Sequence, residues 1–347
     1  MSIVIAIVVF LVIILIHEFG HFIAAKACGI YVREFALGMG PVILRKKGKE
    51  TEYVVRALPI GGSCTFDDDY EEGVVKNPRS FGAKPVWQRI IVILAGPLMN
   101  LILGYIVVVI SLVTAPAMAS TTIYQFKDQS VSSSQLREND RIIAVEGMPV
   151  FSVTDISYKL QNSGRKNEDG NLVFDFTVRR NGEKVELSDV EFMTVGEGVI
   201  YYDFFVYGLE KNFKNVAAQG FRESLSTSRL IIMTLVDIVR GKYGLNDLTG
   251  VIGVGVEIEK AVRTYTFSDL MTIISLITIN LGVFNLIPIP ALDGARLVFL
   301  IVEAIRRKPT RPEVEGMVHF VGFALLMVLM VVVTFNDIVK LFTGGYS

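Results

Sequence analysis

Charged residues are scarce in this chain. Of its 347 residues only 20% are Asp, Glu, Lys or Arg, whereas 51% are hydrophobic, and the mean hydropathy is +0.49. Soluble globular domains carry about 25% charged residues. This shortage of charge excludes an ordinary soluble protein and predicts a membrane protein.

Cysteine, histidine and net charge are also low. The two cysteines, Cys28 and Cys64, give no basis for a disulfide framework. The formal net charge of −1 leaves no basic surplus for nucleic acid, and no nucleic-acid partner is expected. Only three histidines occur, and two of them, His17 and His21, stand within one helical turn.

The chain is rich in long apolar runs. A membrane-spanning helix needs about 20 mostly apolar residues. The first run has no Lys or Arg before it and no small-x-small site directly after it, so we interpret it as a retained helix and not as a signal peptide. Four runs qualify as candidate spans: 3–27, 90–115, 270–289 and 318–335.

The basic residues predict the orientation of these spans. Lys and Arg gather in the loop after the first run and again just before the fourth. Because cytoplasmic loops carry the excess of Lys and Arg, both loops should be cytoplasmic. Residues 116–268 and both termini are then expected on the opposite side of the membrane.

The segments between the spans show strand patterns. Residues 172–187, "LVFDFTVRRNGEKVEL", alternate in polarity around an Asn-Gly pair that favours a hairpin turn, which indicates a small β-rich domain. A helix from about Val216 to Arg240 follows, apolar on one face. It could lie on the membrane surface or pack on the domain as a connector. The first cytoplasmic loop predicts a β-hairpin close to the membrane.

The motif HEFGH lies inside the first run. On an α-helix, His17 and His21 share one face about 6 Å apart along the axis, so both rings can bind one zinc ion. Glu18 can then reach the water that completes the tetrahedron. An ionisable group within a span costs about 2.5–3.5 kcal/mol and is functional by default. The motif therefore predicts an intramembrane metal site.

A catalytic zinc needs a third protein ligand. The third run is broken by Pro288 and Pro290 and then presents Asp293. Irregular backbone at membrane depth is tolerated only where protein or a water-filled cavity satisfies it, so the break belongs at a site. Asn285 could hydrogen-bond a substrate backbone or a developing oxyanion. The alternative is a plain Asp-Gly turn at a helix end. His319 has no partner at ligand spacing and is interpreted as an interfacial histidine.

These motifs resemble one family. HEFGH together with NLIPIPALDG is similar to the site-2 proteases, the zinc-dependent intramembrane metalloproteases, in their bacterial RseP type. "ALGMGP" and "LPIGG" look like the family's membrane-associated β-hairpin loop, "NPRSFGAKPVWQRIIVILAGPLMNLILG" is similar to its entry into the second span, and "QLRENDRIIAVEGMPV" looks like the core of a PDZ domain. The likeness covers most of the chain.

The resemblance carries implications for the site and the substrate. It implies that His17, His21 and Asp293 bind Zn²⁺ and that Glu18 is the general base. The substrates would be transmembrane helices of single-pass proteins, such as anti-sigma factors already cut by another protease, or signal-peptide remnants. The enzyme would lie among lipids of the bacterial cytoplasmic membrane. Further residues are implied in substrate binding: Asn285, Pro288, Pro290, Gly38 and Gly40.

The expected fold is a polytopic α-helical membrane protein of about four transmembrane helices, with a membrane-associated β-hairpin loop and an inserted extracytoplasmic PDZ-like β-rich domain. That domain lacks a clear glycine-rich carboxylate-binding loop, which speaks against binding of peptide tails. A role as a size filter over the active site is therefore an equal alternative. The expected segments are the first helix 1–27, the hairpin loop 28–89, the second helix 90–115, the PDZ-like domain 116–195, the connector 196–268, the third segment 269–305, a cytoplasmic loop 306–317, and the fourth helix with the tail 318–347.

Two other functions deserve comparison with a protease. A catalytically silent membrane scaffold with a PDZ-like domain would have no need of Glu18. A metal or ion transporter would also use His, Glu and Asp within the membrane. The PDZ-like domain and the hairpin loop fit a transporter poorly, so the intramembrane zinc endopeptidase is the leading hypothesis.

Overall fold

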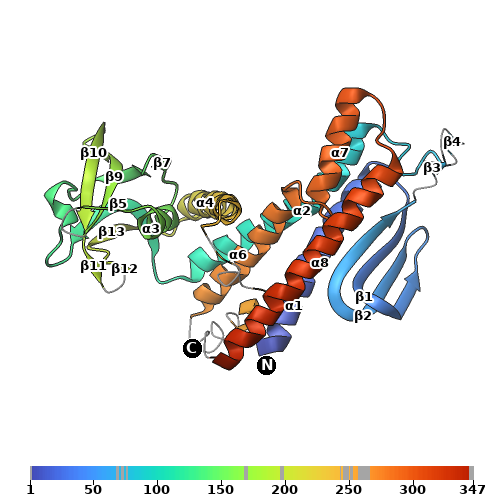
Figure 1. Ribbon diagram of the computed structural model, residues 1–347, viewed down its shortest axis with the longest axis horizontal. Helices are drawn as coiled ribbons and strands as arrows, with labels where there is room; N and C mark the ends of the chain where they lie inside the picture. The colour runs from blue at the N-terminus through green and yellow to red at the C-terminus, as the bar shows by residue number, and fades with distance from the viewer. Residues whose placement is uncertain are drawn as a thin grey trace. The chain divides into compact units, whose positions relative to one another are not determined.

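The computed structural model describes residues 2–67, 70–71, 74–75, 77–167, 171–195, 199–242, 244, 250, 253–256 and 266–343 (Figure 1). The chain divides into two compact units. One contains residues 1–107 and 235–347, and the other contains residues 108–234.

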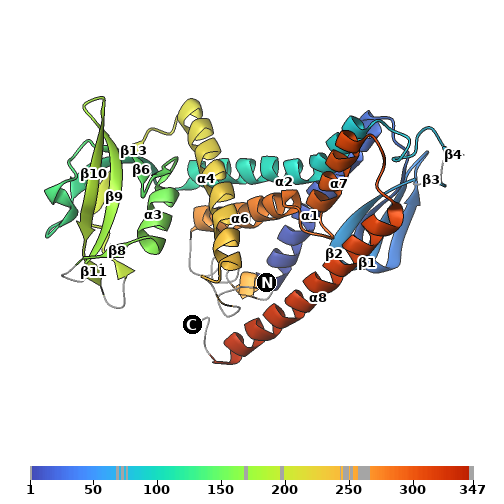
Figure 2. The ribbon, with the colours of Figure 1, turned by 45° about the horizontal axis from the view of Figure 1, so that its top comes forward.

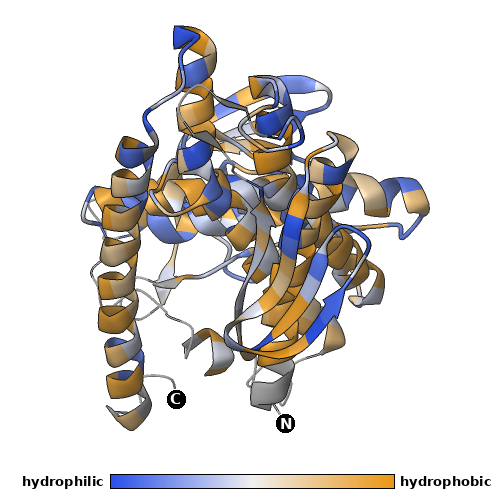
Figure 3. Ribbon diagram, turned by 90° about the vertical axis from the view of Figure 1, so that its right-hand side faces the viewer, coloured by the Kyte–Doolittle hydropathy of each residue, from blue (hydrophilic) through white to orange (hydrophobic). Residues whose placement is uncertain are grey.

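Long apolar helices build most of the first unit. Among the residues that the structure describes, four helices are long and apolar enough to cross a membrane, which agrees with the prediction of a membrane protein. In Figure 3 the helix nearest the C-terminus is apolar over most of its length. Lipid offers no hydrogen-bond partners to the backbone, so such sequences satisfy their N–H and C=O groups as helices. The four are α1 Ser2–Ala27, α2 Val86–Thr114, α6 Phe267–Leu286 and α8 Pro312–Thr343.

The third apolar segment is interrupted at the predicted place. Helix α6 ends at Leu286, and α7, Asp293–Arg306, begins after a turn that contains both prolines (Figure 2). Proline lacks the N–H that would continue the helix ladder. The turn therefore places Asp293 in the first turn of a new helix.

The predicted hairpin is present in the first loop. Strands β1, Val32–Lys47, and β2, Glu52–Phe66, are antiparallel. Part of each strand pairs with two different segments of the other strand. Phe35, for example, is opposite both Cys64 and Tyr53. A short pair follows, β3 Tyr70–Glu71 with β4 Val74–Val75.

The hairpin packs against the first helix. The ring of Phe22 on α1 lies 5.3 Å from that of Phe35 and 6.2 Å from that of Tyr53. Lys26 adds an ion pair of 2.8 Å to Glu50. Aromatic pairs of this kind bury large apolar areas. They fix the hairpin beside the helical turn that carries HEFGH.

The second unit is the predicted β-rich domain. Its sheet has the order β10-β9-β6-β5-β13, with β7 and β8 pairing off this path. Asn181 and Gly182 both have positive φ, 50° and 90°, as the Asn-Gly turn predicts. The elements are β5 Met118–Phe126, η1 Ser132–Ser134, β6 Arg141–Val145, β7 Met148–Pro149, α3 Val153–Asn162, β8 Arg165–Lys166, β9 Leu172–Arg180, β10 Glu183–Phe192, β11 Thr194–Val195, β12 Val199–Ile200 and β13 Phe204–Leu209.

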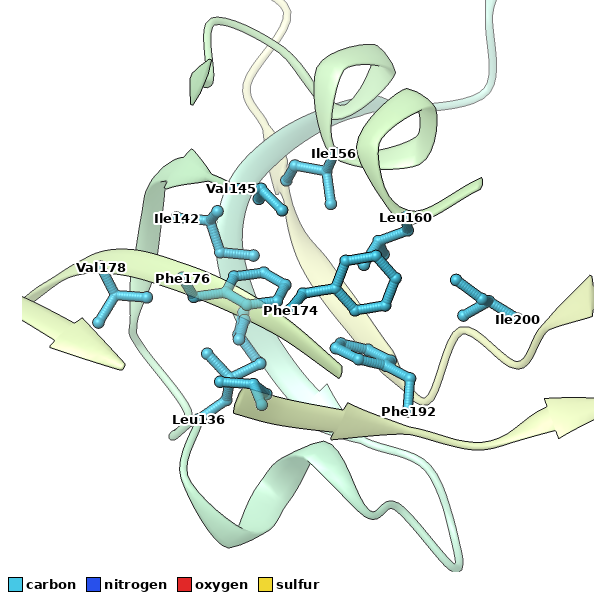
Figure 4. Packing of buried hydrophobic residues seen from close by; sticks show 12 residues of the cluster. Leu136, Ile142, Val145, Ile156, Leu160, Phe174, Phe176, Val178, Phe192 and Ile200 are labelled. Atoms are coloured by element: carbon cyan, nitrogen blue, oxygen red, sulfur yellow. The ribbon is translucent and has the colours of Figure 1, made fainter. Parts of the chain in front are cut away.

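The core of this domain is aromatic. Phe174, Phe176 and Phe192 are at most 1% exposed, and their rings contact one another beneath α3 (Figure 4). The sheet also continues beyond residue 195, where the domain was expected to end, because β13 pairs with β5. That pairing joins segments about 80 residues apart and leaves no local signal in the sequence.

Helix α4, Phe213–Val239, follows the sheet and covers the expected helix from about Val216 to Arg240 except for its last residue. Its Ser226 hydroxyl donates to Asp155 on α3 at 2.7 Å, and Arg229 pairs with the same carboxylate at 2.5 Å. Asp155 is fully buried. A buried carboxylate held by two polar partners fixes one face of α4 on the domain, which supports the connector interpretation.

Candidate metal centre

Three predicted ligands meet within the unit formed by residues 1–107 and 235–347. His17 and His21 lie one turn apart on α1, and Asp293 begins α7. The Nε2 atoms of the two histidines are 3.2 Å apart, and each is 3.1 Å from Oδ2 of Asp293. The two histidines are 9% and 6% exposed. Two histidines on one helix and an aspartate 272 positions after the second of them thus bring three metal-ligating atoms together.

This triangle of donor atoms fits zinc. A tetrahedral zinc with ligands at about 2.0–2.1 Å separates neighbouring donors by roughly 3.3 Å. The observed separations are 3.1–3.2 Å, and no Cys side chain belongs to the group. Three protein ligands leave a fourth position for water or substrate, which is the arrangement of catalytic zinc sites.

Helix α2 orients the second histidine. Nδ1 of His21 donates to the carbonyl oxygen of Val92 at 2.8 Å, which leaves the Nε2 lone pair free for a metal. A Cβ atom on Gly96 would lie only 2.3 Å from Nε2 of His21. Only glycine at position 96 therefore allows α2 to approach the ring closely enough for this hydrogen bond.

Asn100 contacts the first histidine, and the sequence analysis missed it. Its Nδ2 lies 3.3 Å from Nδ1 of His17, and its Oδ1 is buried with no hydrogen-bond partner. Rotating the carboxamide by 180° exchanges these two atoms. Oδ1 then accepts a hydrogen bond from the N–H at Nδ1 of His17, which leaves Nε2 for zinc, so a metal-ready histidine also satisfies the orphaned oxygen. In the sequence, Asn100 is one polar residue within an apolar span, and nothing there identifies His17 as its partner.

Glu18 faces the hairpin. A Cβ atom on Gly62 of β2 would lie 2.7 Å from Cγ of Glu18, so the strand passes directly beside the carboxylate. Burial, together with the charge of Glu18, raises the pKa of the Cys64 thiol to about 12. The thiol therefore stays protonated and is no candidate nucleophile.

The turn before Asp293 has an unusual backbone. Ala291 has a φ of +76°, a left-handed conformation that costs a residue other than glycine about 1–3 kcal/mol. The N–H groups of Ile289 and Leu292 donate to carbonyl oxygens of Ile287 and Ile289 within the turn. His319 supplies the remaining partner, because its Nδ1 accepts from the N–H of Ala291 at 3.1 Å. His319 is thus no part of the ligand triangle but contacts the adjacent turn.

An ion pair joins the two helices around the centre. Arg89 on α2 donates to both carboxylate oxygens of Glu303 on α7, at 3.0 and 2.5 Å. The side chains are 12% and 15% exposed. A bidentate, largely buried pair of this kind fixes geometry as well as adding energy. It ties the helix that orients His21 to the helix that begins with Asp293.

The predicted substrate-binding residues lie on two parts of the fold, the end of α6 with the turn after it and the hairpin. Asn285 lies near the end of α6, where its Nδ2 donates to the carbonyl oxygen of Leu281 at 3.0 Å. Gly38 and Gly40 lie in the hairpin, both with a φ of +85°. A Cβ atom on Gly38 would lie 2.4 Å from the carbonyl oxygen of Leu58. These positions leave their role in substrate binding a prediction.

Comparison with known proteins bears on the function of this centre. The family model described as "Peptidase family M50" matches residues 5–329. The chain belongs to Peptidase family M50. A "Zinc metalloprotease RasP" of Geobacillus kaustophilus is 31% identical, with 98% of each chain covered. A "Regulator of sigma-W protease RasP" of Bacillus subtilis is 30% identical, covering 97% of this chain and 98% of the relative. The predicted site-2 protease family and enzyme class, a zinc metalloendopeptidase that uses Zn²⁺, are confirmed.

Proposed function

We propose that this metallopeptidase cleaves peptide bonds inside the membrane, within the transmembrane helices of single-pass proteins. One observation carries the proposal: both histidines and Glu18 stand on α1, in a segment, Ile7–Ala27, that is long and apolar enough to span a bilayer. A hydrolytic site built into such a helix acts where the substrate's peptide bond is surrounded by lipid.

Each residue of the centre has a chemical role in this proposal. His17, His21 and Asp293 hold the metal, while Val92 and Asn100 orient the two rings. Zinc bound there would make a water acidic at neutral pH and polarise the scissile carbonyl. Glu18 takes the proton from the attacking water and passes it to the leaving amine.

The substrate is proposed to bind as an extended strand. A transmembrane helix must unwind locally before its peptide bonds can be attacked, and its freed backbone groups then need partners. Among the described residues, no other strand pairs with the second edge of 62–66, which runs beside Glu18. Adding the substrate to this edge would satisfy its backbone. Gly38, Gly40, Asn285, Pro288 and Pro290 would shape the surrounding path.

The hairpin is proposed to sit within the membrane boundary. Apolar side chains on β1 and β2 are exposed, and exposed apolar patches mark surfaces that contact lipid or a partner. The charged residues Arg45, Lys46 and Lys47 follow these side chains immediately. The exposed apolar residues are Met39, Val42, Ile43, Leu44 and Leu58, which are 38–65% exposed.

The proposed substrates follow from the name of one relative, "Regulator of sigma-W protease RasP". By analogy, this chain would cut membrane-anchored anti-sigma factors after another protease has removed their outer domain. Signal-peptide remnants are the alternative substrate class. The β-rich domain is proposed to be PDZ-like and extracytoplasmic in a bacterial cytoplasmic membrane protein, acting as a size filter or a reader of peptide tails.

Cleavage of single-pass helices tests this function. We expect the purified full-length protein in detergent to cut at least one member of a panel of tagged transmembrane helices at a bond inside the apolar segment. A zinc chelator should abolish the cut, and added zinc should restore it. Fragment masses locate the bond. Cleavage confined to soluble loops of the panel members would contradict the intramembrane proposal.

The proposed topology predicts a protection pattern. Proteases added to right-side-out vesicles should degrade the β-rich domain and leave residues 45–50 intact, because the basic loop is cytoplasmic. Fragments identified by mass spectrometry report the cut positions, with inside-out vesicles as the matched control. Cleavage at residues 45–50 in right-side-out vesicles would reverse the orientation.

A further inference from the structure

The third histidine lies against the turn that presents Asp293. Its Nδ1 accepts the N–H of Ala291 at 3.1 Å across 28 residues of sequence. Because Nδ1 accepts, the ring proton resides on Nε2. Nε2 is buried and has no hydrogen-bond partner among the described residues, and the nearest carboxylate oxygen, on Glu315, is 3.9 Å away. The contact with Ala291 is therefore the hydrogen bond that this side chain makes.

Helix α8 meets the same turn at a second point. A Cβ atom on Gly322, one helical turn after His319, would lie 2.0 Å from Cβ of Pro290. The backbone of α8 thus touches the turn at Pro290 while the imidazole reaches the next residue. Asp293 and His319 also line one cavity of about 390 Å³. Helix α8 therefore packs against the turn that leads to the proposed metal ligand Asp293.

The hydrogen bond falls on the residue that most needs support. Prolines at 288 and 290 have no N–H, and the N–H groups of Ile289 and Leu292 are satisfied inside the turn. Ala291 has the left-handed φ of +76° and lies two residues before Asp293. Without the acceptor on His319, this partly buried N–H would lose its hydrogen-bond partner within the protein, and the turn would relax toward another conformation.

We propose that His319 is a positioning residue for the metal centre: by accepting from Ala291 it holds the proline turn in the conformation that aims Asp293 at His17 and His21. The inference rests on the proposed role of Asp293 as a zinc ligand. His319 contacts neither substrate nor zinc in this role. It acts through the backbone of the turn, as partners in the outer shell of metal sites do.

The test compares zinc affinity in four forms of the full-length protein in detergent. Competition with a chromophoric chelator gives the zinc dissociation constant for wild type, His319→Leu, His319→Asn and His319→Gln. The Asn side chain places its oxygen as many bonds from Cβ as Nδ1 is, whereas Gln places it one carbon further. We expect Leu and Gln to weaken zinc binding about 10–100-fold, the range for lost outer-shell partners, and Asn to stay within about threefold of wild type.

Two controls keep the result interpretable. Glu315→Gln changes the nearest carboxylate to Nε2 and should leave zinc affinity unchanged. Thermal unfolding of the metal-free forms shows whether each variant folds, and the Asn and Gln variants, alike in polarity, give the same comparison should the Leu variant fail to fold. Zinc bound as tightly by the Gln variant as by the Asn variant would overturn the positioning role.

Failure of this inference is separable from failure of the proposed function. Asp293→Asn, measured in the same way, should lose zinc affinity. If it does, and His319→Gln binds zinc as wild type does, the positioning role is wrong and the ligand set stands. If Asp293→Asn binds zinc as tightly as wild type, the ligand set is wrong and the inference fails with it.

Discussion

Glu18→Gln is expected to lower the rate of peptide cleavage by about 10²–10⁴-fold, the contribution of a general base, while the protein keeps its zinc. Glutamine has the shape of glutamate but cannot take a proton from water. Glu18 is also outside the group of His17, His21 and Asp293 that could hold the metal. Cleavage of a transmembrane substrate and the zinc content of the purified protein are the two measurements.

A matched control separates this effect from the loss of any carboxylate. Glu138 lies exposed in the β-rich domain, and Glu138→Gln should cleave at the wild-type rate. Wild-type cleavage by Glu18→Gln would show that another group is the base. Loss of zinc from Glu18→Gln would show that Glu18 is a ligand and not the base.

His21→Ala is expected to lose both zinc and cleavage. The variant retains two of the three donor atoms and also loses the hydrogen bond from Nδ1 to Val92. Removing an outer-shell partner alone costs about 10–100-fold in metal affinity, so removal of a ligand should cost more than 100-fold. Competition with a chromophoric chelator measures the affinity, and the panel of helices measures cleavage.

Metal-free wild type is the control for this variant. Without zinc, His21→Ala should unfold at a lower temperature than wild type but still cooperatively, because it loses the hydrogen bond to Val92 and the packing of a buried ring against α2. Full zinc occupancy in His21→Ala would refute the ligand assignment. Retained zinc affinity together with lost cleavage would place His21 in catalysis instead.

The sequence predicted the parts of the centre that have local signals. His17 and His21 are four residues apart, and helical geometry alone brings them to one face. Asp293 was predicted because two prolines within an apolar run demand a structural reason. The four apolar helices and the Asn-Gly turn of the β-rich domain were also predicted, because each depends on a single continuous stretch of residues.

The parts that were missed depend on contacts distant in sequence. Asn100 reaches His17 across 83 residues, and its helix looks like any other apolar span. The pairing of β13 with β5 and the double pairing within the hairpin are set by tertiary packing. His319 was expected to have no ligand partner, which holds for the triangle, but its bond to the backbone of Ala291 follows only from how α8 packs.

The position of the three donor atoms along the chain has a consequence for biosynthesis. Two belong to α1, whereas the third lies 272 positions after His21, on α7. A nascent or prematurely terminated chain that ends before α7 holds two histidines and Glu18 but no complete centre. The metal centre can therefore form only after α7 has been translated and has packed against α1.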